Sequence, residues 1–293
     1  MYKHNPVILA PTAQLALEVP NVVASVEAEY GETVVEGTVI TLAHHTGEWR
    51  KCPAPCNNPA ARGGLDGRAG RILISHIDLD TVGGILALRG EQPKDPEFWA
   101  GAEFVDVNGP HNAYKLSGRV QALLRAYWAW SQSQPRVRYT EVTDVTDVVY
   151  RHMDFLWVLL DGGAEAEAAI EAGRVWADEN QAKTDALCIH ETSLVRAFVT
   201  RGVFCNASYY SKKLECAALA CVAYDEEKGS VTLSFADVRS LRGMSAKAMV
   251  QEVWGPDAGG HDGIAGSPRG VAVTKEEFLL LLRNVEEDLA VLG

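Results

Sequence analysis

An imidazole and two carboxylates lie within five residues of one another in the segment 75–81, SHIDLDT. The segment directly follows the apolar run 71–74, which is typical of a buried parallel strand. Open α/β sheets place their sites at the carboxyl ends of strands. Side chains alternate along extended backbone, so His76, Asp78 and Asp80 would share one side. Carboxylates suit hard divalent cations, and an imidazole shifts the preference toward manganese, iron, cobalt or zinc. These three residues are therefore predicted metal ligands.

A weaker form of the same pattern follows along the chain. The apolar run 103–107 predicts a second strand, which carries Asp106 and ends at Asn-Gly-Pro. His111 comes next, at the start of a helix predicted over 112–134. An aspartate at a neighbouring strand end is well placed to bridge two metal ions. Asp106 is therefore predicted as a ligand, and His111 as a further candidate.

Two other histidine-containing segments could contribute to the same site. In the predicted helix 145–160, residues i and i+2 point in different directions, so only one of His152 and Asp154 should face the ions. Asp154 is the predicted ligand and His152 its supporting partner. His44 and His45 end a predicted strand, where one of the two could reach the site; a structural or surface role is equally open.

A glycine-rich segment near the carboxyl terminus has the composition of an anion-binding loop. Residues 255–270 hold six glycines, and Gly259, Gly260 and His261 are consecutive within it. Glycine lets the backbone approach an anion closely and direct N–H groups at it. Arg269 could grip a phosphate or carboxylate with two hydrogen bonds. A plain surface turn is the alternative.

The elements that must position these residues alternate between strand and helix. This alternation predicts an α/β domain with a parallel sheet, including helices over 81–88, 145–160 and 164–179. After about residue 183 the pattern changes to a hairpin, 216–224 with 230–235, then a helix over 245–254 and a terminal helix that starts with a capping box at Thr274. We predict a boundary near 175–190, with one domain over 1–180 and a smaller one over 185–293.

Composition excludes several classes of protein. The chain of 293 residues is 47% hydrophobic and 23% charged, which argues against disordered and fibrous proteins. No apolar run approaches the roughly 20 residues that cross a bilayer, and the amino terminus lacks the apolar core of a secretory signal, so we expect a cytoplasmic protein with no membrane partner. A net charge of −12 argues against binding of long nucleic acid. Six cysteines are too few for a disulfide framework, and no structural zinc is predicted for Cys52 and Cys56.

Two motifs resemble the DHH phosphoesterase superfamily, which includes RecJ-type exonucleases, nanoRNases, family II pyrophosphatases and Prune-type exopolyphosphatases. Residues 74–84, ISHIDLDTVGG, are similar to its first metal motif. Residues 231–238, VTLSFADV, and 258–266, AGGHDGIAG, are similar to a strand and a glycine-histidine loop of the C-terminal domain in RecJ and nanoRNase relatives. No Asp-His-His triplet follows the first motif. Its nearest equivalents are Asp106 with His111, and His152 with Asp154.

The resemblance implies a two-metal hydrolase, usually manganese-dependent, whose site lies in a cleft between an N-terminal parallel-sheet domain and a smaller C-terminal α/β domain. His76, Asp78 and Asp80 would be ligands, with Asp106 as the bridge. Asp80 and His111 would have catalytic roles, His111 as a ligand or as a group that stabilises charge at phosphorus. The far end of the substrate would be held by four residues of the glycine-rich segment: Gly259, Gly260, His261 and Arg269.

The sequence therefore predicts a hydrolase of a small anionic, nucleotide-like phosphoester or phosphoanhydride that uses two divalent transition-metal ions, most simply Mn²⁺. Two alternatives remain open: a nuclease that trims short oligonucleotides, and a non-catalytic module that senses a ligand. A homodimer is compatible with either.

Overall fold

The computed structural model describes residues 5–65, 67–135, 137, 139–202, 208–211, 213–238, 241–268 and 270–292, apart from the side chains of His111 and Leu292. The chain forms two compact units. The first comprises Met1–Val107 and Leu116–Trp176, and the second comprises Asn108–Lys115 and Ala177–Gly293. The domain limits drawn from the sequence remain predictions. In the described part of the chain, no helix is both long enough and apolar enough to span a membrane.

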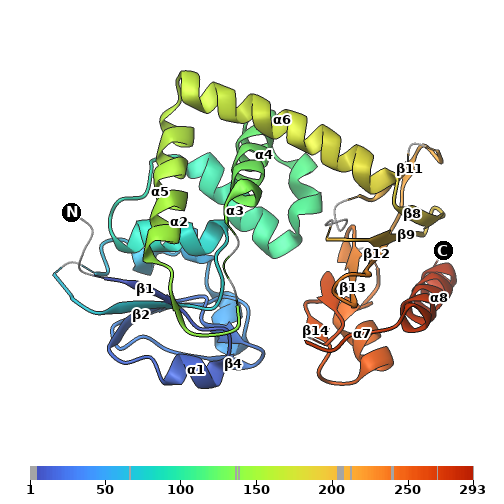
Figure 1. Ribbon diagram of the computed structural model, residues 1–293, viewed down its shortest axis with the longest axis horizontal. Coiled ribbons are helices and arrows are strands. Elements are labelled where there is room, and N and C mark those ends of the chain that lie inside the picture. Colours follow the sequence, from blue (N-terminus) through green and yellow to red (C-terminus); the bar gives the residue numbers. More distant parts are fainter. Residues whose placement is uncertain are drawn as a thin grey trace. The chain divides into compact units, whose positions relative to one another are not determined.

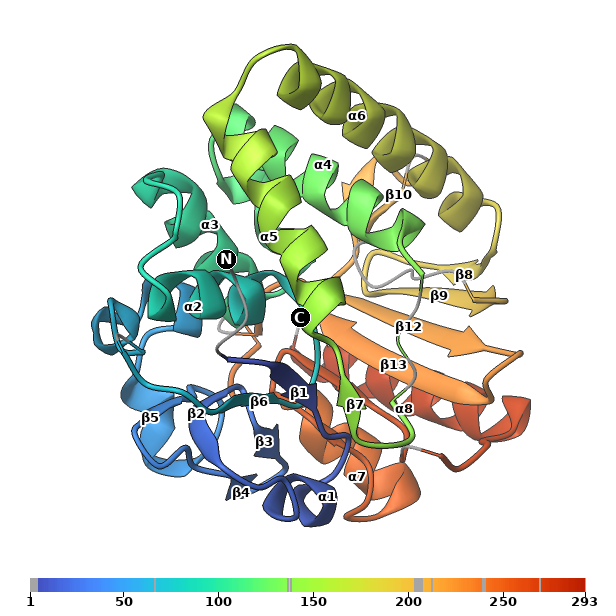
Figure 2. The ribbon, with the colours of Figure 1, turned by 60° about the vertical axis from the view of Figure 1, so that its left-hand side comes forward.

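The first unit is built on a five-stranded sheet in the order β5-β2-β6-β1-β7 (Figure 2). Its four neighbours β5, β2, β6 and β1 are parallel, and only β7 runs antiparallel, beside β1. Both β1 and β2 are buried along their whole length, as strands covered on both faces must be. The predicted parallel-sheet α/β class is confirmed. The strands are β1 (Val7–Leu9), β2 (Val22–Val26), β5 (Ile40–Leu42), β6 (Arg71–Ile74) and β7 (Thr143–Asp144).

Helices cover both faces of this sheet. The short α1 lies on one side, and α2 and α5 lie on the other (Figures 1 and 2). The predicted helices over 81–88, 145–160 and 164–179 correspond to α2, α5 and α6, and α6 continues into the second unit. The helices are α1 (Ala13–Leu17), α2 (Leu79–Leu88), α3 (Pro96–Asn108), α4 (Gly118–Ser133), α5 (Thr146–Asp161) and α6 (Ala164–Asp185). Shorter elements are the hairpin β3 (Glu29–Tyr30) and β4 (Thr33–Val34), and the 3₁₀ turns η1 (Gly47–Lys51), η2 (Pro55–Asn57), η3 (Pro59–Ala61) and η4 (Pro110–Lys115).

The strand predicted over 103–107 is wrong, because these residues form the end of helix α3. Phe98, Ala102 and Val105 are buried at helical spacing, whereas Val107 is 62% exposed. The apolar residues of the run 103–107 suggest a strand. The buried face of helix α3, however, also includes residues that precede this run. The helix predicted over 112–134 is also divided: η4 is followed by α4, whose start is capped by Ser117.

The second unit contains a six-stranded sheet in the order β14-β15-β13-β12-β9-β8, in which only the β9–β12 pair is parallel. Helices α7 and α8 contribute to one hydrophobic cluster with its strands (Figure 1). The predicted hairpin and capping box are confirmed: β12 pairs with β13, and the Thr274 hydroxyl accepts the Glu277 N–H at 3.2 Å. The elements are β8 (Cys188–Glu191), β9 (Val195–Thr200), β10 (Tyr210–Ser211), β11 (Cys216–Ala217), β12 (Ala220–Asp225), β13 (Ser230–Phe235), β14 (Gly259–Gly260), β15 (Ile264–Gly266), α7 (Ala246–Trp254) and α8 (Lys275–Leu292).

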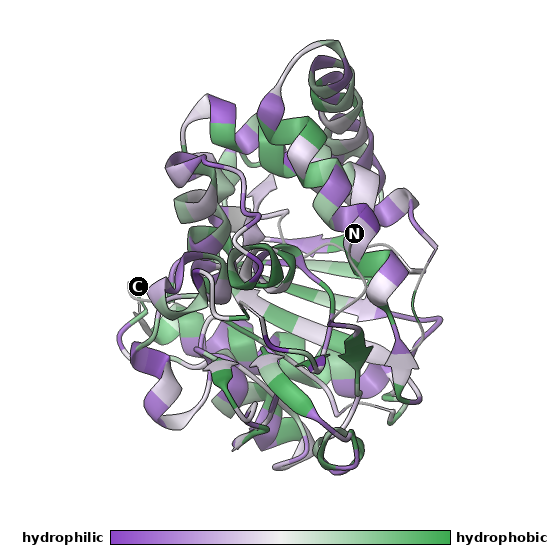
Figure 3. Cartoon of the chain, turned by 90° about the vertical axis from the view of Figure 1, so that its left-hand side faces the viewer, coloured by the Kyte–Doolittle hydropathy of each residue, from purple (hydrophilic) through white to green (hydrophobic). Residues whose placement is uncertain are grey.

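Hydropathy follows this layering in both units. Hydrophobic segments are concentrated on the strands, whereas the outer helices alternate between polar and apolar residues (Figure 3). Every residue of α2 is buried, although it contains two glycines. A Cβ at Gly83 would lie 2.6 Å from both Cys56 Cβ and Trp99 Cζ3. Glycine at this position therefore lets η2 and α3 approach the backbone of α2.

We expect Gly83→Ala to destabilise the protein, because η2 or α3 must move to admit one methyl group. The cost should be about 1–3 kcal/mol of unfolding free energy, partly offset by the roughly 1 kcal/mol better helix propensity of alanine. Urea unfolding of the metal-free protein measures this change. Gly118→Ala is the matched control, since Gly118 also lies in a helix and a Cβ there would meet no atom within 4 Å. Equal stability of the two variants would contradict the packing argument.

Candidate metal centre

The ends of three neighbouring parallel strands supply most of a polar cluster. Strand β2 lies between β5 and β6, and all three run in the same direction. Glu27 follows β2, His76 lies just past β6, and the pair His44-His45 lies just past β5. Because carboxyl ends of parallel strands meet at one edge, these side chains converge although 49 positions separate Glu27 from His76.

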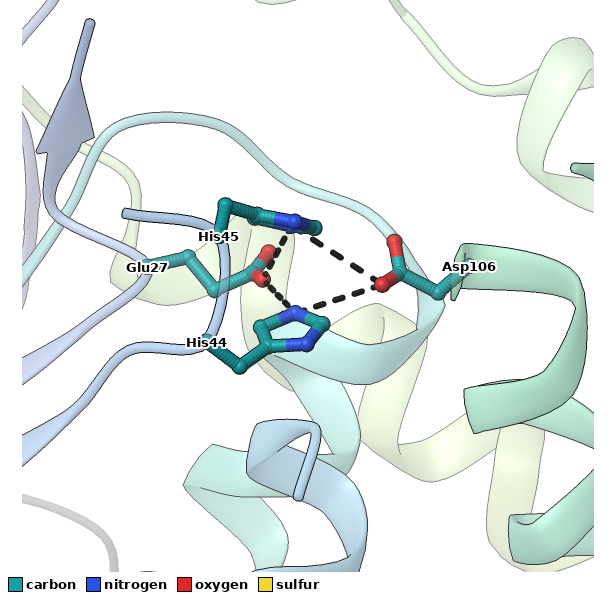
Figure 4. A group of neighbouring side chains, drawn as sticks. All are labelled: Glu27, His44, His45 and Asp106. Atoms are coloured by element: carbon teal, nitrogen blue, oxygen red, sulfur yellow. Dashed lines mark hydrogen bonds and ion pairs between the residues drawn. The ribbon is translucent and has the colours of Figure 1, made fainter. Parts of the chain in front are cut away.

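Glu27 is the centre of this cluster (Figure 4). Its side chain is completely buried, and its Oε1 lies 2.7 Å from His44 Nε2 and 3.1 Å from His45 Nε2. Its Oε2 lies 3.2 Å from His76 Nε2. The backbone of Glu27 has φ of +50°, a left-handed conformation that is uncommon outside glycine. Such a conformation often marks a functional site, because the surrounding structure must compensate for its cost.

Two aspartates complete the cluster from helices. Asp80 lies in the first turn of α2, and Asp106 lies in the last turn of α3. Asp80 Oδ2 and Asp106 Oδ2 are buried oxygens without a hydrogen-bond partner among the described residues. The His44 ring lies beside both, with its Nε2 3.5 Å from the Asp80 oxygen and 3.2 Å from the Asp106 oxygen. Buried oxygens left without partners are costly, so a ligand that satisfies both is expected.

The ligand atoms fall into three overlapping groups, each with its members within 4.8 Å of one another. The shared members are Glu27, Asp78 and Asp106, each of which belongs to two groups. The first group has two imidazoles and two carboxylates, the second has one imidazole and two carboxylates, and the third has carboxylates only. The groups are Glu27, His44, His45 and Asp106; Glu27, His76 and Asp78; and Asp78, Asp80 and Asp106.

Hydrogen bonds outside the cluster hold the imidazoles in place. The carboxylate of Glu29 accepts the backbone N–H of His44 at 3.0 Å and that of His45 at 3.1 Å. The Ser75 hydroxyl donates to the Glu27 carbonyl and lies 2.8 Å from His76 Nδ1. Ser75 therefore accepts from Nδ1–H, so Nε2 is the nitrogen that would bind a metal ion once it has lost its proton.

Two contacts orient the carboxylates in the same way. The Thr81 hydroxyl donates to Glu27 Oε2 at 3.0 Å. Asp78 is the N-cap of α2: its Oδ1 accepts the Thr81 N–H at 3.0 Å, and its Oδ2 faces His76 Nε2 at 2.9 Å. The hydroxyl and the helix cap fix these two side chains before any ligand binds.

Crowding of the carboxylates shifts their pKa values in opposite directions. Burial, together with the charges of Asp78, Glu27 and Asp106, raises the pKa of Asp80 well above its usual range. Burial and the charges of Glu27 and Asp78 raise the pKa of Asp106 to about 7. Burial also opposes ionisation of Glu27, but hydrogen bonds from His44, His45 and His76 outweigh it and hold the Glu27 pKa well below its usual range.

The imidazoles respond to this negative environment. Burial lowers the pKa of His45, but the hydrogen bond and charge of Glu27 and the charges of Asp106 and Glu29 outweigh it and raise the pKa to about 9. Burial likewise disfavours the charged form of His76, whereas Asp78 and Glu27 raise its pKa well above the usual range. Protons therefore supply the positive charge that a divalent cation would supply in the metal-bound protein.

The structure brings four predicted ligands together: His76, Asp78, Asp80 and Asp106 all belong to the ligand groups. It places Asp154 differently, exposed on α5 and in none of the three groups. The expected orientation of this helix is corrected, because His152 is the buried residue and lies 2.8 Å from the Tyr127 hydroxyl. Burial lowers the His152 pKa to about 4, so this ring is neutral.

The other predicted residues lie in or beside the second unit. His111 belongs to η4, and its side chain is outside the described residues, as is Arg269. Gly259 and Gly260 form β14, and the His261 N–H donates to the Ile264 carbonyl at 2.7 Å. The catalytic role of His111, the substrate-binding roles of the glycine-rich segment, and a site between two domains all remain predictions.

Glu27 was not predicted as a site residue, and only one of His44 and His45 was predicted to be able to reach the site. Both histidines join the same ligand group. The missing signal was the end of β2: Glu27 follows five buried residues in the way that His76 follows β6. In the family that the sequence resembles, the Asp-His-His triplet follows the first metal motif, whereas the His44-His45 pair of this chain precedes it.

No protein-family model and no curated protein matches the chain. Among solved structures, the chain is similar to RecJ from Thermus thermophilus, determined in complex with Mn²⁺, with 14% identity and a TM-score of 0.42. The match covers 91% of this chain and 41% of the RecJ chain. The present chain therefore corresponds to about two fifths of that protein.

Proposed function

We propose that the protein is a metal-dependent hydrolase of a small phosphoester or phosphoanhydride, and that it uses two divalent ions, most simply Mn²⁺. The observation that carries the proposal is the pair of buried oxygens without partners, Asp80 Oδ2 and Asp106 Oδ2, directed into a cluster of three imidazoles and four carboxylates. Mixed nitrogen and oxygen donors favour a transition metal over calcium or magnesium. The residues present therefore fit such ions.

A pair of ions is favoured by the way the groups share residues. Glu27, Asp78 and Asp106 each belong to two groups, and a carboxylate has two oxygens with which to contact two cations. Seven donor side chains are also more than one ion needs. A pair of divalent ions bound by these residues would supply an activated water and charge stabilisation for hydrolysis.

The protein residues would then have separate tasks. Glu29 and Ser75 orient imidazoles, and Thr81 orients Glu27. The carboxylates offset the repulsion between the cations. The site also suits an anionic substrate, because two dications would bring four positive charges against four carboxylates and three neutral imidazoles. A phosphate oxygen would therefore not meet net negative charge once the ions are bound.

The decisive experiment is hydrolysis of a substrate panel by purified protein supplied with Mn²⁺. The panel contains dinucleotides, short oligonucleotides, cyclic dinucleotides, phosphomonoesters and polyphosphates, and released phosphate or nucleotide is measured. Turnover of at least one class that stops after chelation supports the hydrolase. Binding of two ions without turnover of any class would instead favour the ligand-sensing alternative, and release of mononucleotides from short oligonucleotides would favour the nuclease.

We expect Glu27→Gln to reduce metal binding from about two ions per chain toward one or none, because one charge shared by two ligand groups is lost. Manganese is measured by elemental analysis after desalting. Glu36→Gln is the matched control, since Glu36 is exposed on the same unit. Circular dichroism checks that both variants fold. Two tightly bound ions in folded Glu27→Gln would exclude Glu27 as a shared ligand.

Affinity for Mn²⁺ should rise with pH between 6 and 9. With a pKa of about 9, His45 is protonated at neutral pH and must lose its proton before it binds a metal. Asp106, with a pKa of about 7, adds a second proton in the lower part of this range. The association constant should therefore rise about tenfold per pH unit for each proton displaced. Calorimetric titration in buffers of different ionisation enthalpy measures both the association constant and the number of protons released. An affinity that is independent of pH would contradict the assignment of His45 and Asp106 as ligands.

A further inference from the structure

The candidate metal centre is most exposed to solvent at His76 and Asp78, whose side chains are 42% and 37% exposed. Those of His45 and Asp106 are 24% and 19% exposed, and those of Glu27, His44 and Asp80 are at most 3% exposed. A substrate that approaches bound ions from the most exposed side would therefore meet the segment that contains His76 and Asp78. Any residue that contacts the substrate on this side should lie beside that segment.

Tyr139 lies there. It belongs to the connection between α4 and β7, and its hydroxyl oxygen is 3.4 Å from the backbone nitrogen of Ile77, the residue between the two exposed ligands. The side chain is not a core residue, because Tyr139 is 47% exposed. An aromatic side chain from a segment 62 residues away is thus placed with its hydroxyl beside the backbone that joins His76 to Asp78.

The direction of this hydrogen bond leaves the phenol proton available. The Ile77 N–H is the donor and the Tyr139 oxygen is the acceptor, so the O–H of Tyr139 can still donate. The described residues offer no acceptor for it. A phosphoryl group held by ions at His76 and Asp78 would place anionic oxygens near this donor, and a hydrogen bond to an anion is about twice as strong as one to a neutral acceptor.

We propose that Tyr139 is a substrate-contacting residue, which donates a hydrogen bond from its hydroxyl to an oxygen of the metal-held phosphoryl group. This inference rests on the proposed function for its ligand class. It adds a residue that is neither a metal ligand nor part of the glycine-rich segment. Tyr139→Phe keeps the ring and its packing and removes only the donor.

The test uses orthophosphate as the probe and the full chain loaded with Mn²⁺. Calorimetry compares wild type, Tyr139→Phe and the control Tyr210→Phe, which alters another half-exposed tyrosine in the second unit. Orthophosphate should bind Tyr139→Phe roughly tenfold to a hundredfold more weakly than wild type, as expected for loss of one hydrogen bond to a charged group. Manganese content and melting temperature should not change, and Tyr210→Phe should bind like wild type.

Equal orthophosphate affinity of Tyr139→Phe and wild type would overturn the inference, as would failure of wild type to bind orthophosphate. Loss of manganese in Tyr139→Phe would also overturn it, since the residue would then support the metal centre and not the substrate. The proposed function fails separately, if wild type binds orthophosphate but hydrolyses no member of the substrate panel. Where hydrolysis occurs, kcat/KM of Tyr139→Phe should fall by a similar factor.

Discussion

The electrostatic balance between four carboxylates and three imidazoles is the constraint on which the rest of the first unit depends. Such a concentration of acids would be strongly unfavourable without positive charge, since burial and mutual repulsion both oppose ionisation. Protonated imidazoles partly meet this demand in the metal-free state, and Asp80 and Asp106 meet the remainder by elevated pKa values. A bound cation would offset the cost of this arrangement.

The parallel sheet explains how distant segments produce one cluster. Glu27, the His44-His45 pair and His76 come from consecutive positions across the sheet, because β5, β2 and β6 are neighbours. Helix α2 then carries Asp80 directly from the end of β6, and the glycine at position 83 allows α3, with Asp106, to approach. Spatial order across the sheet, and not order along the chain, determines which residues meet.

Local pattern was sufficient to predict part of this arrangement. The run 71–74 with its polar continuation predicted both strand β6 and three members of the cluster, His76, Asp78 and Asp80, because strand, turn and helix start are contiguous there. Asp106 was predicted as a ligand for a reason that proved wrong, since it lies on a helix and not at the end of a strand. Glu27 could not be identified in this way, because its role depends on tertiary pairing of β2 with β6 and on an unusual backbone conformation. Asp154 points outward because another face of α5 packs inward. A single His/Asp pair in the sequence does not determine which face that is.

Asp78 has one oxygen committed to the first turn of α2 and the other directed toward His76. The helix therefore immobilises this side chain during folding, before any ion arrives. Ordering a free side chain on binding costs roughly 0.5–1.5 kcal/mol of conformational entropy. For Asp78 that entropy has already been lost in the folded protein, so the attraction between carboxylate and cation is not reduced by it. The helix cap would thus increase the affinity of the proposed site for a cation, although the capping oxygen itself is committed to the helix.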